Sequence, residues 1–452
     1  MTERLVVIGG DAAGMSAASQ ARRRRAADDL EIVAYERSSW VSYSACGEPY
    51  HVAGHVDPIE ALVARTPERF GTMDIEVHTR HEVREIDMDR RRVVVHDRDQ
   101  DRHFEQAFDQ LMVATGSKPI RPAIRGRELD GVHELRTLDD AAELRRIADR
   151  RAGNAVIVGG GYIGLEVAEA FHTQGWTVTV VTAGTSVLDK TVDSELGQKV
   201  IGRMESVGIQ VALSSRVECI NGKQRVESVG CPDATYPADV VILGLGTEPE
   251  VELAADAGIG LGETGAIAVD DRQRTSHDGV WSAGDCAEAL HRVTGKPCNI
   301  HLGTIANKTG RIAGMNIGGE AASFPGVLGT AITRICDFEI SATGLRRHDA
   351  IDTGFDIVVG EASGTTTAGY MPEAADITIA TVAERNTGRI LGAEIVGGPG
   401  SAKRIDVFAA AIWSGMTAQD LAWTDLAYAP PFSGVWDLIH ISARNAARLA
   451  LA

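Results

Sequence analysis

Two segments of the chain share one pattern of apolar and polar positions. In each, a short apolar run, at residues 5–9 or 155–159, ends in a glycine-rich turn and leads into a stretch with helical spacing. A second apolar run follows, at residues 31–35 in the first segment and 177–181 in the second. Short apolar runs bounded by turns predict buried strands, so each segment predicts a β-α-β unit of about 30 residues.

The remaining segments predict a hairpin, a helix and a separate C-terminal module. The charged, strand-like residues 93–104 between the two units predict a hairpin, and residues 304–316 predict a helix. Further on, strand-like runs at residues 331–336 and 376–383 precede a helical tail at residues 405–414. This change of pattern predicts a third module of the α+β type.

Length and charge narrow the classes of protein that fit. A chain of 452 residues exceeds one ordinary core and predicts roughly two to four domains. Its formal net charge of −18 argues against nucleic acid or an anionic membrane surface as a partner. No stretch approaches the roughly 18 uninterrupted apolar residues of a membrane span. The one basic run, residues 22–25, is either a solvated helix face or part of a ligand site.

The six cysteines are far apart, and no two form a Cys-x-x-Cys pair. This spacing argues against a disulfide framework or a structural zinc site, and we expect no metal site. It also favours a reducing cytoplasm as the compartment. Five of the six fit small, buried apolar positions, namely Cys219, Cys231, Cys286, Cys298 and Cys336.

The first glycine-rich turn predicts a dinucleotide site. Glycines at this position let the backbone approach a pyrophosphate, whose charge is met by the N-terminal end of the following helix. Asp11 stands where the middle glycine is usual, between Gly10 and Gly14. Glu36, at the end of the next strand, is placed to accept hydrogen bonds from a ribose. The alternative is a tight strand–helix turn without a ligand.

The second glycine-rich turn is complete and predicts a second dinucleotide site, with Gly159, Gly161 and Gly164 in place. The following strand ends at Thr182, where an acid would favour NADH and a nearby arginine would favour NADPH. Neither is present. The choice stays open, with a slight preference for NADPH or for use of both.

Two such units, followed by strand-and-turn segments at residues 114–119 and 282–285, resemble the two-dinucleotide-fold flavoproteins, the pyridine nucleotide-disulfide oxidoreductase family. The resemblance implies an α/β fold with two Rossmann-like domains, for FAD and NAD(P), and a C-terminal α+β dimerisation domain. It implies that Asp285 contacts the ribityl chain of the flavin. The implied domains are a discontinuous FAD-binding domain (1–118 and 245–323), an NAD(P)-binding domain (119–244) and a dimerisation domain (324–452).

The segment at residues 42–50, Ser-Tyr-Ser-Ala-Cys-Gly-Glu-Pro-Tyr, identifies the group within the family. Disulfide reductases with an internal pair carry a second cysteine five positions after the first, and here that position is His51. A single cysteine resembles the coenzyme A-disulfide reductase group and its relatives, the NADH oxidases, peroxidases and persulfide reductases. The resemblance implies an FAD-dependent NAD(P)H:disulfide or persulfide reductase that works through Cys46, with coenzyme A disulfide as the leading substrate. The thiolate is the reactive form, so we expect a lowered pKa for Cys46.

Three positions depart from the pattern of the group, and two alternative functions stay open. Oxidases and peroxidases carry a histidine where this chain has Ala12, which counts against oxygen or peroxide as the main acceptor. Ala45 replaces a frequent asparagine and Met371 a frequent tyrosine, and both weaken coenzyme A as the thiol. The alternatives are an NADH oxidase or peroxidase with a cysteine sulfenate, and a redox-sensing flavoprotein relay.

The resemblance also implies roles for individual side chains. Tyr370 and Tyr428 lie in segments whose tyrosines reach the cysteine of the partner subunit in a homodimer, although Tyr428 also fits packing in a helix. Gln20 and Arg23 fall on the helix that binds coenzyme A. Tyr162 gates the nicotinamide pocket, or packs at a helix start. The positions implied for cofactor binding are Gly9, Gly10, Ala13, Gly14, Glu36, Arg37, Ser42, Ala114, Thr115, Gly116, Gly159, Gly161, Tyr162, Ile163, Gly164, Glu166, Gly246, Gly284, Asp285, Thr304 and Ala306.

Overall fold

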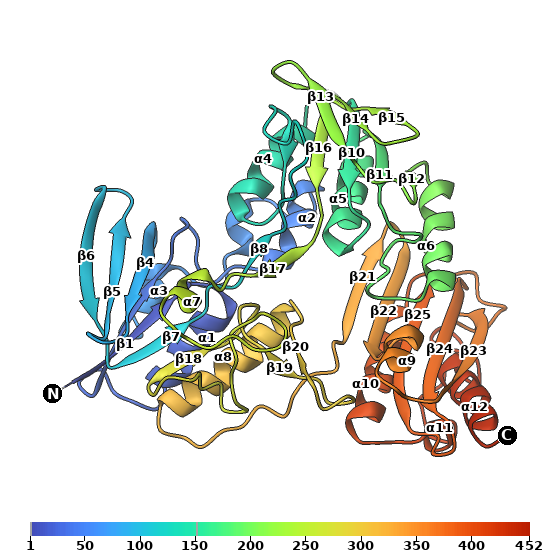
Figure 1. The fold of residues 1–452 in the computed structure, drawn as a ribbon. Helices are drawn as coiled ribbons and strands as arrows, with labels where there is room; N and C mark the ends of the chain where they lie inside the picture. The colour runs from blue at the N-terminus through green and yellow to red at the C-terminus, as the bar shows by residue number, and fades with distance from the viewer. Residues whose placement is uncertain (1, 151) are drawn as a thin grey trace.

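The computed structural model describes residues 2–150 and 152–452. Three bodies, each built on its own five-stranded sheet, form an arch with the middle body at its top (Figure 1). The N-terminal body carries β1 and α1, the middle body carries β10 and α5, and the C-terminal body carries the strands from β21 onwards. This is the predicted α/β fold with an α+β module at its C-terminal end.

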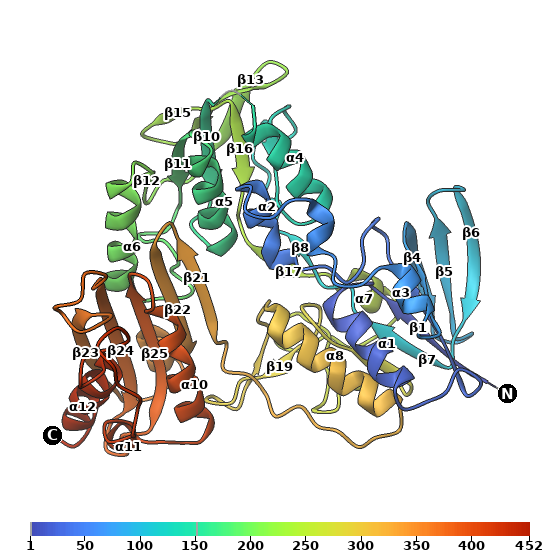
Figure 2. The same ribbon diagram turned by 180° about the vertical axis from the view of Figure 1, so that it is seen from behind.

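The first body is a parallel sheet in the order β18-β7-β1-β2-β3. Because β18 joins this sheet from beyond the middle body, the chain leaves the first body and later returns to it. Helices α1 and α8 lie side by side on one face (Figure 2). The elements are β1 (Glu3–Ile8), α1 (Ala12–Arg22), β2 (Leu30–Tyr35), β3 (Ile75–His78), β7 (Gln110–Val113), β18 (Val280–Ser282) and α8 (Gly303–Ile317).

Glycines on α8 allow the two helices to touch. A Cβ at Gly310 would lie 2.2 Å from the carbonyl oxygen of Ala13, and one at Gly314 would lie 2.2 Å from that of Ala17. Since residues four apart share a helix face, these two glycines form a flat strip against α1. The close fit fixes the start of α1 relative to the start of α8, which is where the first glycine turn lies.

The predicted hairpin at residues 93–104 is confirmed and belongs to a three-stranded antiparallel sheet in the order β4-β5-β6. The predicted helix at residues 304–316 is α8. Shorter elements complete this part of the chain: α3 (Pro67–Gly71), β4 (His81–Asp87), β5 (Arg92–Asp97), β6 (Arg102–Ala107), α7 (Glu252–Asp256), β19 (Ala289–Leu290) and β20 (Pro297–Cys298).

The middle body repeats the design, with a parallel sheet in the order β12-β11-β10-β16-β9 and a small antiparallel sheet of β13, β14 and β15. Two strands, β8 and β17, run antiparallel to each other and connect it to the first body. Its elements are β8 (Ser117–Pro119), β9 (Val132–His133), α4 (Leu138–Ala148), β10 (Asn154–Val158), α5 (Tyr162–Thr173), β11 (Thr177–Val181), α6 (Ser194–Ser206), β12 (Gln210–Ala212), β13 (Cys219–Gly222), β14 (Val226–Gly230), β15 (Thr235–Pro237), β16 (Val240–Leu243) and β17 (Thr247–Pro249).

The C-terminal body is an antiparallel sheet in the order β21-β22-β25-β24-β23. The predicted helical tail is α10, but it does not end the chain. Helices α11 and α12 follow, and α12 packs so closely that a Cβ at Gly360 would lie 2.1 Å from the backbone nitrogen of Ala446. The elements are β21 (Ala331–Ile335), β22 (Phe338–Gly344), α9 (Arg347–Asp352), β23 (Ile357–Thr365), β24 (Asp376–Glu384), β25 (Ile390–Gly397), α10 (Ile405–Trp413), α11 (Ala418–Leu421) and α12 (Leu438–Ala450).

Across residues 2–150 and 152–452, no helix has both the length and the apolar character needed to cross a membrane. The domain boundaries after residues 118, 244 and 323 stay a proposal.

A buried acid fastens the C-terminal body to the middle one. Glu394 of β25 is 1% exposed, and its Oε2 accepts a hydrogen bond from the backbone N–H of Asp193, 2.9 Å away, at the start of α6. Its Oε1 is buried and has no partner among the described residues. Burial, together with the charge of Asp193, raises the pKa of Glu394 to about 8. The acid is therefore neutral at pH 7.

We expect the Glu394→Gln variant to be more stable than the wild type at pH 8 and to lose that advantage towards pH 4.5. The folded state holds the proton of Glu394 up to about pH 8, whereas an unfolded glutamate releases it near pH 4.3, so the wild type loses stability as the pH rises between these values. Glutamine stays neutral and keeps the hydrogen bond to Asp193. Thermal unfolding at several pH values measures the gap, with the exposed Glu60→Gln as control; a gap independent of pH would contradict this.

Candidate functional site

The first glycine turn joins β1 to α1 in a conformation that only glycine fits. Gly9 has φ +103°, and a Cβ there would lie 2.1 Å from the carbonyl oxygen of Ala114. At Gly14 a Cβ would lie 2.0 Å from the carbonyl oxygen of Gly9. The backbone N–H of Gly10 donates to Oε2 of Glu36, 2.8 Å away at the end of β2. The predicted glycines and acid therefore form one tight unit.

The N-terminal end of α1 is left open to an anion. Its N-cap residue, Asp11, makes no capping hydrogen bond; the carboxylate instead accepts one from the backbone N–H of Tyr43 (3.2 Å). Unpaired N–H groups and the helix dipole together make such an end a site for phosphate. Burial is the main cause that raises the pKa of Asp11 to about 6, and the charge of Glu36 adds to it. With this pKa the carboxyl is mostly charged at pH 7.

Residues from three other parts of the chain meet this turn. A Cβ at Gly284, where φ is +84°, would lie 2.9 Å from the Cβ of Ala13. Next to it, Asp285 Oδ2 accepts a hydrogen bond from Ser117 Oγ (3.0 Å). Helix α8 begins there without a side-chain cap, with Thr304 in its first turn. The other predicted positions here are Ala114, Thr115 and Gly116 after β7, Arg37 after β2, and Ala306 on α8.

The second glycine turn is an open cradle. Gly159 has φ +119°, and a Cβ there would lie 2.1 Å from the carbonyl oxygen of Gly244. A Cβ at Gly164 would lie 2.4 Å from the carbonyl oxygen of Gly159. At Gly161, by contrast, a Cβ would meet no heavy atom of the described chain within 4 Å, and α5 starts there without a side-chain cap. The space at Gly161 is therefore available to a ligand.

Side chains at the start of α5 line the same region. Tyr162 packs against the core of the middle body; its buried hydroxyl has no hydrogen-bond partner among the described residues, and burial raises its pKa to about 12. Ile163 is 39% exposed. Glu166 accepts a hydrogen bond at Oε1 from Thr333 Oγ1 (2.7 Å), so it ties α5 to β21. Gly246, with φ +90°, lies between β16 and β17.

Cys46 lies on a segment that spans the first and middle bodies. It is part of a short 3₁₀ turn, η1 (Ala45–Gly47), which leads directly into α2 (Glu48–Val52). Before it, the backbone N–H of Ser42 donates to the carbonyl oxygen of Gly10 (2.9 Å). After it, α2 lies against α4 and α5 of the middle body (Figures 1 and 2). The cysteine therefore stands between the two glycine turns.

The surroundings of Cys46 bear on one expectation. Its side chain is exposed, and all six cysteines are free thiols. The packed surroundings, and then the charges of Glu166 and Glu48, raise the pKa of Cys46 rather than lower it. The protein's own groups therefore do not lower this pKa, because the surroundings are packed and hold two carboxylates. A lowered pKa beside an electron-poor flavin stays a prediction.

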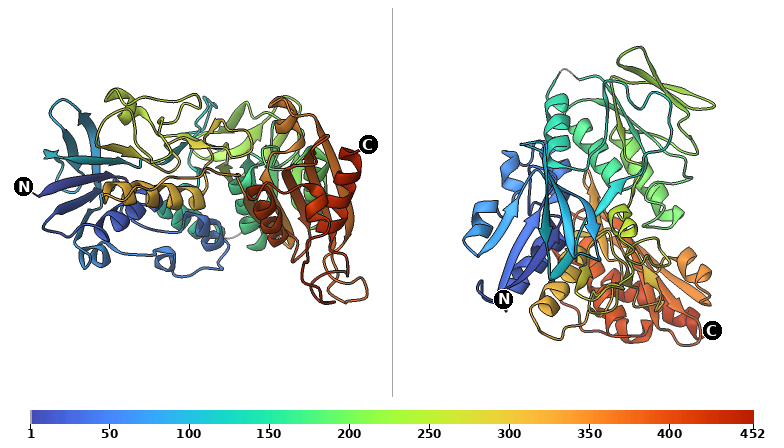
Figure 3. Two further views of the ribbon diagram at one scale, coloured as in Figure 1. Left: turned by 90° about the horizontal axis from the view of Figure 1, so that it is seen from below. Right: turned by 60° about the vertical axis from the view of Figure 1, so that its left-hand side comes forward.

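The two predicted tyrosines lie together but away from Cys46 of the same chain. Tyr370 is 75% and Tyr428 47% exposed, and both are in loops of the C-terminal body, so packing of Tyr428 in a helix is wrong. Desolvation and then the neighbouring Tyr370 raise the pKa of Tyr428. Red loops of this body project away from its sheet (Figure 3, left). In Figure 1, α11 and α12, which flank the loop of Tyr428, lie far from α2.

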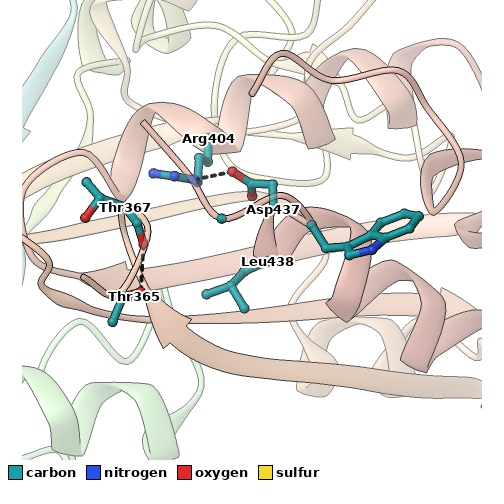
Figure 4. Close-up of a pocket in the computed structure, with 8 residues that line it drawn as sticks. Thr365, Thr367, Arg404, Asp437 and Leu438 are labelled. Carbon is teal, nitrogen blue, oxygen red and sulfur yellow. Dashed lines mark hydrogen bonds and ion pairs between the residues drawn. The ribbon is translucent and has the colours of Figure 1, made fainter. Parts of the chain in front are cut away.

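One arginine holds both tyrosine loops. The Nη2 of Arg404 donates to the carbonyl oxygens of Thr366 (2.7 Å) and Phe432 (2.6 Å), and its Nε pairs with Asp437 Oδ2 (3.0 Å). Figure 4 shows this ion pair at a pocket of about 130 Å³. The pocket is lined by Thr365, Thr367, Gly369, Arg404, Gly434, Trp436, Asp437 and Leu438.

The basic run at the end of α1 is mostly structural. Arg22 donates to backbone carbonyl oxygens, Arg24 pairs with Glu320 and with Gln20 Oε1, and Arg25 pairs with Asp29. Arg23 is exposed and, within the described chain, makes no side-chain hydrogen bond or ion pair. Gln20 is 6% exposed, so a ligand reaches Arg23 more easily than Gln20.

Several residues at the site carry no motif. Arg136 bonds twice to the carbonyl oxygen of Ser117 (Nε, 3.1 Å; Nη2, 3.0 Å), beside Asp285. Glu250 pairs with Arg37 (2.7 Å). Glu48 is buried two residues after Cys46, and its place in the segment at residues 42–50 is the one sequence signal for it.

Two glycine turns on parallel sheets, with an exposed thiol between them, define an oxidoreductase of the two-dinucleotide class. Residues 3–310 match the family described as pyridine nucleotide-disulphide oxidoreductase, and residues 330–438 match the dimerisation domain of that family. The chain belongs to the pyridine nucleotide-disulphide oxidoreductase family. The resemblance seen in the sequence is thereby confirmed, and FAD and NAD(P)H are the cofactors of this family.

Known relatives are similar over nearly the whole chain. The chain is 40% identical over 442 residues to a Pyrococcus abyssi protein named NAD(P)H sulfur oxidoreductase (CoA-dependent), with 97% of each covered. It is 35% identical over 445 residues to a Methanocaldococcus jannaschii protein named NADH oxidase, with 98% of each covered. The solved NAD-dependent persulfide reductase from A. fulgidus has a TM-score of 0.93 and 38% identity, over 98% of this chain and 82% of that one.

We expect Gly161→Ala to weaken NAD(P)H binding without loss of stability. The residue has ordinary extended backbone angles and an empty surrounding, so the methyl group strains nothing in the protein, but it enters the cradle where a pyrophosphate would lie. The KM for NAD(P)H should rise about tenfold, equal to about 1.4 kcal/mol, with unchanged flavin content.

Gly202→Ala is the matched control, because Gly202 of α6 also has no heavy atom of the described chain within 4 Å of a Cβ. Equal KM values for the wild type and both variants would contradict a nucleotide site at Gly161.

Proposed function

We propose that this protein is an FAD-dependent NAD(P)H:disulfide or persulfide reductase that works through Cys46, with coenzyme A disulfide or a coenzyme A persulfide as substrate. The observation that carries the proposal is the position of Cys46, an exposed thiol on a segment bonded to the first glycine turn and packed against the helix that starts at the second. The relatives named above as sulfur and persulfide reductases support the same substrate class.

The first body fits FAD by the chemistry of its donors. In this proposal, the open N-terminal end of α1 holds the pyrophosphate, Glu36 the adenosine ribose and Asp285 the ribityl chain. The open N-terminal end of α8 faces the same site. The cradle at Gly161 holds the pyrophosphate of NAD(P)H, and Tyr162 covers the nicotinamide pocket. When bound, these cofactors supply the two-electron transfer.

The protein's own part in the reaction is carried out by the sulfur of Cys46 and by the groups that supply protons to it. The thiolate of Cys46 attacks the sulfur–sulfur bond of the substrate, displaces one thiolate and becomes half of a mixed disulfide. An electron pair then breaks that disulfide, which returns Cys46 to a thiolate and releases the second thiol. Over one cycle, NAD(P)H and one proton convert one disulfide into two thiols. Cys46 neither gains nor loses atoms in the cycle.

The tyrosines supply the proposed proton for the leaving thiolate from the other subunit. Tyr370 and Tyr428 lie away from Cys46 of their own chain, on loops of the body that matches the dimerisation domain. In a homodimer with a shared site, Tyr428 donates its proton to the departing thiolate and Tyr370 supports it. Arg23, with Gln20 beneath it, binds the nucleotide part of coenzyme A. A cytoplasmic location fits free thiols of this kind.

An NADH oxidase is the second candidate, favoured by the 35% identical relative of that name. A histidine at the start of α1 would support a sulfenate in an oxidase. This chain has Ala12 there, and its methyl group is apolar. Comparison of NAD(P)H consumption with coenzyme A disulfide and with oxygen alone separates the two functions. Faster turnover with oxygen alone would favour the oxidase.

We expect Cys46→Ser to abolish disulfide reduction while the protein stays yellow. A serine hydroxyl cannot form a mixed disulfide, so turnover should fall by at least about a thousandfold, whereas the glycine turns that hold the flavin are untouched. NAD(P)H oxidation with coenzyme A disulfide and the flavin absorbance measure the two effects.

Cys231→Ser, which changes a half-buried cysteine of the middle body, is the control and should keep wild-type turnover. Undiminished turnover by Cys46→Ser would refute the role of Cys46. Intact-mass measurement of the protein as isolated then identifies the thiol, because a coenzyme A adduct on Cys46 has its own mass.

A further inference from the structure

A carboxyl group without a hydrogen bond lies buried next to the reactive thiol. Glu48 begins α2, two residues after Cys46, and is 4% exposed. Its Oε1 is buried, and no described residue donates a hydrogen bond to the carboxyl group. A charged carboxylate in such a place is strongly disfavoured unless it is paired, so the neutral acid is the favoured form.

No cation near Glu48 is free to form an ion pair with it within the described chain. Arg136 is the cation that faces it, and the Nε and Nη2 of this arginine already bond to the carbonyl oxygen of Ser117. The other ionisable groups that face Glu48 or Cys46 within the described chain are Asp11, Tyr43, Tyr50, Asp140 and Glu166. Burial first, then Asp140 and Asp11, raise the pKa of Glu48 to about 8 against the opposing effect of Arg136.

Glu48 and Cys46 therefore compete to carry a negative charge at one place. Each raises the pKa of the other when it is charged, because the interaction between two sites is reciprocal. Asp11 loses its proton near pH 6 and is already charged in the alkaline range. Burial also raises the pKa of Glu166, but the hydrogen bond from Thr333 stabilises its charged form and opposes that rise. The ionisation near pH 8 beside the thiol is that of Glu48.

We propose that Glu48 is a neutral, proton-carrying acid during turnover, and that its ionisation suppresses the thiolate of Cys46 and so sets the alkaline limit of the reaction. This inference rests on the proposed function. Glu48 is a positioning residue here, since it acts on Cys46 through its charge. While Glu48 is protonated, breaking the mixed disulfide places the thiolate of Cys46 beside a neutral carboxyl group. Once Glu48 has lost its proton, the same thiolate must form beside the charged carboxylate, which disfavours it.

Alkylation of Cys46 by iodoacetamide tests the inference on the flavin-bound enzyme after reduction and removal of excess reductant. The rate constant, followed by mass spectrometry from pH 6 to pH 11, reports the fraction of thiolate. In the wild type we expect two ionisations in the profile. In Glu48→Gln we expect one, at lower pH, with alkylation about three to ten times faster at pH 8–9, because the thiolate no longer forms beside the charge of Glu48.

Glu394→Gln is the matched control, because it also removes a buried acid with a pKa raised to about 8, but in the C-terminal body. Its profile should match that of the wild type. Flavin content and thermal unfolding check each variant, and Glu48→Leu replaces Glu48→Gln if the latter does not bind flavin, since it removes the same charge.

A single ionisation in the wild type, or identical profiles for the wild type and Glu48→Gln, would overturn the inference. Because alkylation uses no disulfide substrate, that result would leave the reductase proposal standing. Undiminished turnover by Cys46→Ser would instead remove the proposed function and leave the alkylation profiles unchanged.

Discussion

The attachment of the Cys46 segment at both of its ends is the constraint on which the site depends. At one end, the backbone N–H groups of Ser42 and Tyr43 bond to the first glycine turn, at Gly10 and Asp11. At the other end, Arg145 of α4 donates to the carbonyl oxygen of Val52, and Gln174 donates to that of Ala53 (2.7 Å). The segment is thus fixed to two bodies, and the thiol keeps its place between their glycine turns.

This attachment also explains the unusual electrostatics of the thiol. Packing α2 against the middle body buries Glu48 and brings Glu166 of α5 close to Cys46. The packed surroundings, and then the charges of these two acids, raise the pKa of Cys46. The protein's side chains therefore do not generate the thiolate by themselves. Such a site would work best if the buried acids stayed neutral and a bound, electron-poor flavin ring stabilised the thiolate of Cys46.

The sequence predicted the features that depend on local geometry. Gly9 and Gly159 must be glycine because of their positive φ and the carbonyl oxygens next to them, and such requirements appear as a motif. The role of Cys46 could be predicted from the residues next to it in the sequence. The charge interaction between Glu48 and Arg136, nearly ninety positions along, depends on how α2 packs on another body, and no local pattern records that. The same holds for Arg404, which bonds to two loops, and for α12, whose alanine-rich face resembles many surface helices.

A crystal structure of the oxidised enzyme with its flavin tests the central claim most directly. The quantity to measure is the distance from Cys46 Sγ to the nearest atom of the isoalloxazine ring. The account predicts van der Waals contact, about 3.5–4 Å, with the ring on the side of the Cys46 segment that faces the first glycine turn. A ring bound with Sγ beyond about twice that contact distance would contradict it.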